Sequence, residues 1–146
     1  MARVTNSITI ERPIEDVFET LTNAENTGRW FPGKVKEWWT SSSPTRVGST
    51  RHAVATVLWF RSENDGVVTA YEPPSRAVLR VTTPGMPYEV SLAFEAANRG
   101  TRVVVTSEVT FPGIRALTAP LVLRVYRAAW ERGLANLKRT MEAGEL

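Results

Sequence analysis

The sequence predicts an α+β fold in which one antiparallel sheet is covered by a long C-terminal helix. Apolar residues recur at steps of three and four through roughly the last thirty positions, which is the spacing of one helix face. Between residues 34 and 111, short apolar segments alternate with breaks rich in glycine and proline, as in strands joined by turns. Those breaks are too short for parallel crossovers, so neighbouring strands are expected to pair antiparallel.

One strand and two short helices are expected at the N-terminus. Polar and apolar side chains alternate over residues 4–11, which is the period of a strand with one buried face. Pro13 favours a helix start, because proline is tolerated in a first turn, and the apolar spacing continues to about Thr22. Asn23 can cap a second, shorter helix, which places Trp30 at a helix end.

Six strands and the long helix are expected to follow. One face of the later strands is apolar and the other is polar, so we expect the apolar face to pack against the helix. The tripeptide Asn64-Asp65-Gly66 is expected to form one of the turns. The expected strands span residues 34–41, 49–60, 66–72, 77–83, 88–96 and 101–111. The helix should present one apolar face, made of Leu123, Tyr126, Trp130, Leu134, Leu137 and Met141.

Length and composition indicate one globular domain over residues 1–146. Hydrophobic residues make up 42% and charged residues 23%, close to globular averages. No apolar stretch approaches the roughly 18 residues of a membrane span, and no secretion signal is visible. We therefore expect a cytoplasmic protein. The net charge of +3 comes from scattered residues, so no nucleic-acid partner is expected.

The residue types also limit the chemistry. The sequence has no cysteine and a single histidine, His52, so a zinc or non-haem iron site is not expected. It has no nucleophile elbow and no phosphate-binding glycine loop. We expect no metal and no cofactor.

The order of elements comes with four short motifs at matching places: Ile10-Glu11-Arg12-Pro13, Trp30-Phe31-Pro32, Glu72-Pro73-Pro74 and Gly100-Thr101. In this combination the chain resembles the START-like polyketide cyclase/dehydrase and lipid-transport superfamily (SRPBCC). The resemblance implies a helix-grip fold, with a curved seven-stranded antiparallel sheet around the C-terminal helix and a ligand cavity between them. Lipid carriers, cyclases and co-chaperone activators share this fold, so function depends on the cavity residues.

Tryptophan and tyrosine are the most informative candidates for a cavity lining, because their rings are apolar and carry one polar group. Tyr88 on its strand and Tyr126 and Trp130 on the helix are expected to converge. Trp30 is expected near the opening. Trp38 and Trp39 are adjacent in a strand, so only one of them can face the cavity. The predicted ligand-binding residues are Trp30, Trp59, Tyr88, Ser107, Tyr126 and Trp130.

The leading hypothesis is binding, with transport as a possible role, of a small hydrophobic, aromatic or lipid-like ligand in this cavity. The alternative is a cofactor-independent polyketide cyclase or dehydratase that transfers protons through His52, Tyr88 or Tyr126. Arg51 is a further candidate for such an enzyme, because the register of its strand is ambiguous. A second alternative is a protein-interaction module that uses an exposed tryptophan and residues 112–120.

Overall fold

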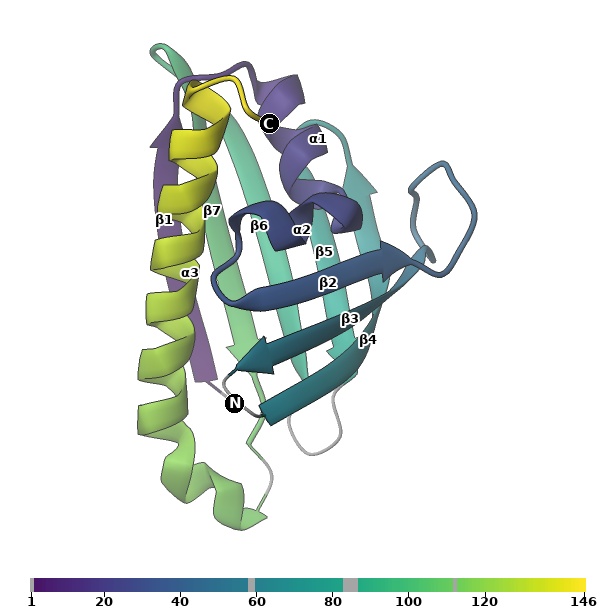
Figure 1. Ribbon diagram of the computed structural model, residues 1–146, viewed down its shortest axis with the longest axis vertical. Helices are drawn as coiled ribbons and strands as arrows, with labels where there is room; N and C mark the ends of the chain where they lie inside the picture. Colours follow the sequence, from purple (N-terminus) through teal and green to yellow (C-terminus); the bar gives the residue numbers. More distant parts are fainter. Residues whose placement is uncertain (1, 58–59, 83–86, 112) are drawn as a thin grey trace.

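A curled antiparallel sheet of seven strands surrounds one long helix in the computed structural model, which describes residues 2–57, 60–82, 87–111 and 113–146 (Figure 1). The strand order is β1-β7-β6-β5-β4-β3-β2, with every neighbouring pair antiparallel. The strands are β1 (Ala2–Ile10), β2 (Lys34–Trp39), β3 (Thr50–Val57), β4 (Phe60–Glu72), β5 (Arg76–Thr82), β6 (Tyr88–Ala97) and β7 (Gly100–Val109). The predicted α+β helix-grip architecture is confirmed.

The helical elements are α1 (Ile14–Thr22), the 3₁₀ turn η1 (Ala24–Asn26), α2 (Thr27–Trp30), the 3₁₀ turn η2 (Gly113–Thr118) and α3 (Ala119–Glu142). The helices α1, α2 and α3 lie on the concave face of the sheet, and the turn η2 extends past the end of the sheet (Figure 1). Asn23 begins η1 as expected, because its side-chain Oδ1 accepts a hydrogen bond from the Glu25 backbone N–H at 3.1 Å. Where one short helix was expected after Asn23, the structure has two consecutive elements, η1 and α2.

The second half of α3 holds the sheet and α1 together. Leu134, Leu137 and Met141 are at most 2% exposed and belong to the same apolar core as Phe18 and Phe94. The Phe18 ring meets the Phe94 ring edge-on, with centroids 5.0 Å apart. Burying these side chains supplies the main driving force for packing the helix against the sheet. The space for a cavity is therefore left beside the first half of α3.

The hairpin between β3 and β4 differs from the prediction. We expected a turn at Asn64-Asp65-Gly66, but these residues lie inside β4, where Arg51 pairs with Gly66. A Cβ at Gly66 would lie 3.0 Å from the Nε of Arg51. This glycine thus makes room for a guanidinium group rather than for a turn.

A close backbone approach also explains Gly100 at the start of β7. A Cβ at this position would overlap the backbone of Ile10 and Glu11. Only glycine leaves room for the two strands to pass at this distance.

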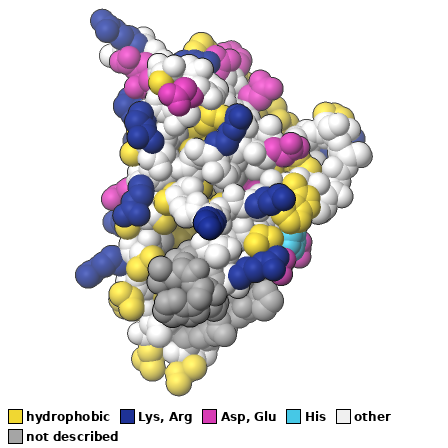
Figure 2. Space-filling view, viewed as in Figure 1, with side chains coloured by type: hydrophobic (Ala, Val, Ile, Leu, Met, Phe, Trp, Pro, Cys, Tyr) yellow, Lys and Arg dark blue, Asp and Glu magenta, His cyan; other side chains and the backbone are white. Residues whose placement is uncertain are grey.

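Charged side chains do not gather into a single-sign patch on the face shown in Figure 2, where Lys and Arg are interspersed with acidic and uncharged residues. Among the described residues, no helix is both long enough and apolar enough to cross a membrane.

Candidate ligand-binding site

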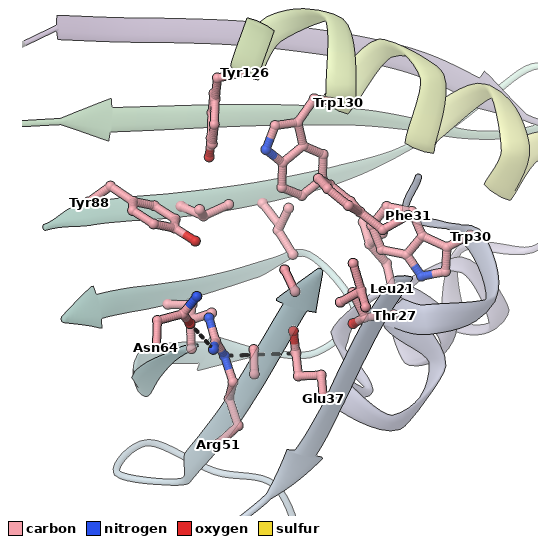
Figure 3. A pocket seen from close by; sticks show the side chains of 16 residues that line it. Leu21, Thr27, Trp30, Phe31, Glu37, Arg51, Asn64, Tyr88, Tyr126 and Trp130 are labelled. Atoms are coloured by element: carbon pink, nitrogen blue, oxygen red, sulfur yellow. Dashed lines mark hydrogen bonds and ion pairs between the residues drawn. The ribbon is translucent and has the colours of Figure 1, made fainter. Parts of the chain in front are cut away.

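A cavity of about 190 Å³ lies between the concave face of the sheet, the end of α2 and the first half of α3 (Figure 3). Most of its wall is apolar, with Val35, Ala53, Leu79 and Leu92 on the side of the sheet. Aromatic rings from α2 and α3 lie at one end, and a small group of charged and polar side chains lies at the other. A mostly apolar wall with a few polar groups is typical of small-molecule sites.

Tyr88, Tyr126 and Trp130 converge on this cavity from two elements. Tyr88 comes from β6, and the other two come from successive turns of α3 (Figure 3). The centroids of the two tyrosine rings are 5.9 Å apart in an edge-on arrangement. The Trp130 ring contacts Phe31 in the same way at 5.3 Å. Their contact with a ligand stays a prediction.

Trp30 lines the cavity from an interior position, so our expectation that it lies at the opening is wrong. Its side chain is only 3% exposed and packs against Trp130, with ring centroids 5.9 Å apart. The reason is Gly133, where a Cβ would lie 3.3 Å from the rings of Trp30 and Phe31. This glycine lets the end of α2 press against α3, which buries the tryptophan.

The polar end of the cavity is built around Arg51 on β3 and Glu37 on β2. Arg51 is 4% exposed, and its Nε lies 3.8 Å from the Oε1 of Glu37. The guanidinium also donates a hydrogen bond to the side-chain Oδ1 of Asn64 on β4. The inward register left open for Arg51 is therefore the observed one. Glu37 and Asn64 are cavity residues that the sequence reasoning missed.

Burial raises the pKa of Glu37 above its ordinary value. The positive charge of Arg51 and a hydrogen bond with Thr27 oppose that rise. A carboxyl group shifted in this way by its surroundings is a candidate for binding or proton transfer. It lies in a largely apolar cavity, where charge interactions are stronger than in water.

The two tyrosines are held as neutral phenols. Burial raises the pKa of Tyr88, and the nearby Arg51 partly offsets this. Burial is also the main cause that raises the pKa of Tyr126. The Tyr126 hydroxyl donates a hydrogen bond to the Oγ of Ser107 at 2.9 Å. Ser107 is 1% exposed and does not line the cavity, so it orients Tyr126 instead of facing a ligand.

His52 lies on the opposite face of the sheet. Its Nδ1 is 2.7 Å from the Oδ1 of Asp65, and its Nε2 is 3.1 Å from the Oε1 of Glu63. These contacts raise the pKa of His52. Its ring lies 5.1 Å from that of the partly exposed Trp38. The structure therefore corrects the role we considered for His52, because side-chain alternation directs it away from the cavity.

Trp39 is the tryptophan of the adjacent pair that faces inward. It lines a smaller cavity of about 80 Å³, which shares Glu37 and Arg51 with the larger one. Its indole Nε1 donates a hydrogen bond to the Oδ1 of Asn23 at 3.3 Å. The remaining predicted site residue, Trp59, lies outside the described residues.

The segment considered as a protein-binding loop is largely helical. Residues 113–118 form η2 and residues 119 and 120 open α3, while residue 112 lies outside the described part of the chain. Large exposed apolar side chains in η2 and the first two turns of α3 are those of Ile114, Leu117, Leu121 and Val125. Within the described residues, no cluster of three or more His, Asp or Glu side chains has the arrangement of a metal site.

A sequence signal for the charged pair did exist. Glu37 shares strand parity with Val35 and Trp39, and Arg51 shares it with Ala53. A charged residue on the mostly apolar side of a strand is unusual and needs a partner. In the structure Glu37 on β2 pairs with Ala53 on β3. Arg51 is two residues before Ala53 and therefore lies on the same face of the sheet as Glu37.

The curled sheet, the long helix packed on it and the cavity between them define a helix-grip protein. The chain belongs to the polyketide cyclase/dehydrase and lipid transport family, which it matches over residues 1–142. No functionally curated protein matches its sequence.

Solved structures share the fold at low sequence identity. TTHA0849 from Thermus thermophilus is 19% identical, with a TM-score of 0.81 over 99% of this chain and 100% of that one. NE0264 from Nitrosomonas europaea is 16% identical, with a TM-score of 0.76 over 98% and 96%. DynU16, from the dynemicin biosynthetic locus, is 20% identical with a TM-score of 0.68, and the match covers 97% of this chain but 48% of that protein.

Proposed function

We propose that this protein binds a small, largely apolar ligand with one aromatic ring in the cavity beside α3. The observation that carries the proposal is the combination of an apolar and aromatic wall with one charged pair, Arg51 and Glu37, at a single end. Apolar burial supplies affinity in such sites, and a few polar groups fix orientation. Membership of the polyketide cyclase/dehydrase and lipid transport family also supports the binding of a ligand.

The size of the cavity favours a single ring over a long acyl chain. Its volume is about 190 Å³. An apolar cavity of roughly 150 Å³ is known to accept benzene. A ring placed here would contact Trp130 and Phe31, whose own edge-on contact leaves ring surface facing the cavity.

Toluene is a suitable first probe, and two matched variants show where it binds. Ala53→Leu adds side-chain volume inside the cavity, whereas Ala93→Leu adds the same volume on the exposed face of β6. We expect the wild type and Ala93→Leu to bind toluene with similar affinity in an NMR titration. Ala53→Leu should bind at least about tenfold more weakly, provided that its circular dichroism is unchanged. Equal affinity in all three proteins would exclude the cavity as the binding site.

A second candidate function is proton transfer on a carbonyl compound, because the half-buried Glu37 lies beside Arg51 and lines the same cavity as Tyr88. The Glu37 carboxylate would remove a proton from the carbon next to the carbonyl. Hydrogen bonds from Arg51 and Tyr88 would stabilise the enolate oxygen. Return of the proton to carbon restores the carboxylate, so the step needs no further reactant.

Deuterium exchange tests this second function without knowledge of the natural substrate. Acetophenone incubated in D₂O with the wild type should exchange its methyl protons faster than in buffer, as seen by proton NMR. Glu37→Gln should remove the acceleration, because an amide does not act as the base. Exchange at the buffer rate with the wild type would leave binding as the supported function.

A further inference from the structure

Arg51 and Glu37 lie close together without forming a hydrogen bond to each other. The Nε of Arg51 is buried and has no hydrogen-bond partner among the described residues. Its distance of 3.8 Å from the Oε1 of Glu37 exceeds the 2.7–3.2 Å range of an N–H···O hydrogen bond. A buried donor without a partner is unfavourable, so an additional group at this point would be stabilised.

Charge limits what that group can be. Arg51 and Glu37 together are neutral, and both face the same cavity. An anionic ligand would lie close to the Glu37 carboxylate, and a cationic one close to the guanidinium. Like charges within about 4–6 Å disfavour one another, most strongly away from water. An uncharged polar group avoids both conflicts.

Donor and acceptor roles narrow the choice further. A guanidinium only donates hydrogen bonds, and an ionised carboxylate only accepts them. A ketone oxygen would satisfy Arg51 but not Glu37, whereas a hydroxyl group accepts from one and donates to the other. One oxygen placed about 2.9 Å from each atom would span the observed separation of 3.8 Å. Because the Nε is buried, the guanidinium must turn toward the cavity to receive that oxygen.

We propose that the bound ligand carries an uncharged hydroxyl group, such as that of a phenol, which bridges the Nε of Arg51 and the carboxylate of Glu37. The ring lies toward Trp130 and Phe31, in the apolar part of the cavity. This inference rests on the proposed binding function and names the class of ligand for that site. It separates phenols from hydrocarbons of the same size and from aromatic carboxylates.

Three probes of similar size test the inference: 4-methylphenol, toluene and 4-methylbenzoate at pH 7. A hydrogen bond to a charged group is worth about one factor of ten or more in affinity. We therefore expect 4-methylphenol to bind the wild type at least about tenfold more tightly than either other probe, measured by isothermal titration calorimetry or NMR.

Two variants test the assignment to these residues. Glu37→Gln leaves Arg51 without its counter-charge, so the preference should shift by at least about tenfold toward 4-methylbenzoate. The double variant Glu37→Leu/Arg51→Met removes both charges and avoids an unpaired one. It should bind toluene and 4-methylphenol with affinities within about threefold of each other.

The possible outcomes distinguish this inference from the proposed function. Equal wild-type affinity for toluene and 4-methylphenol would overturn the hydroxyl bridge and leave the binding function standing. Tighter wild-type binding of 4-methylbenzoate would also overturn it, in favour of an anion site at Arg51. Failure of all three probes to bind would contradict the binding function itself.

Discussion

Stability measurements on the Arg51–Glu37 pair test how the polar end of the cavity is built. At the observed 3.8 Å, and with an effective dielectric constant of about 20, the attraction between the charges is about 4 kcal/mol. Both side chains have lost most of their contact with water, so desolvation offsets much of this gain. We expect Arg51→Met or Glu37→Leu alone to lower the free energy of unfolding by about 3–5 kcal/mol.

The double variant is expected to behave differently from the sum of the single ones. With both charges replaced by apolar side chains, the free energy of unfolding should lie within about 2 kcal/mol of the wild type, which implies strong coupling. Urea denaturation followed by circular dichroism measures all four proteins. Additive effects, within about 0.5 kcal/mol, would refute the pairing of these two residues.

The pH dependence of the free energy of unfolding provides a second test of the Arg51–Glu37 pair. Because burial raises the pKa of Glu37, its contribution to stability is largest below the ordinary value of 4.5 and falls as pH rises through the raised pKa. Removing Arg51 should raise this pKa further. The loss of stability in Arg51→Met should therefore be small near pH 4.5 and larger at pH 8. If the loss of stability in Arg51→Met did not depend on pH, the unpaired charge of the Glu37 carboxylate would not be its cause.

Two further predictions concern residues outside the cavity. Gly100→Ala should lower the melting temperature by at least about 5 °C, because a Cβ overlaps the backbone of Ile10, and an unchanged value would contradict this close approach. The His52 imidazole should titrate above 6.5 by NMR, because Asp65 and Glu63 accept its hydrogen bonds. The stability that it contributes is full below 6.5 and lost as pH rises through the raised pKa. His52→Gln should remove this pH dependence without weakening toluene binding.

Local periodicity predicted the antiparallel strands and the long helix, whereas the helix-grip arrangement was implied by the family resemblance. The three-and-four spacing from Leu123 to Met141 identified the long helix and the face that it buries. Alternation in β6 and β7 identified the apolar face of the sheet, and with it the convergence of Tyr88 and Tyr126. Such patterns involve only residues that are close in the sequence, so they can be recognised without knowledge of tertiary contacts.

The mistaken expectations depend on contacts between segments far apart in the sequence. Gly66 was assigned to a turn because the side chain that needs its space, Arg51, belongs to another strand. Trp30 was placed at the opening because the small residue that buries it, Gly133, lies on α3. A glycine retained for close packing looks the same in sequence as one retained for a turn.

A crystal structure with 4-bromophenol tests the central claim most directly, because the anomalous signal of bromine locates the ligand independently of its shape. The account predicts one dominant bromine peak in the apolar part of the cavity, near Trp130 and Phe31. The phenol oxygen should lie within hydrogen-bonding distance of Arg51 and Glu37. An empty cavity, with bromine only on the exposed apolar surface at η2 and the start of α3, would contradict the account.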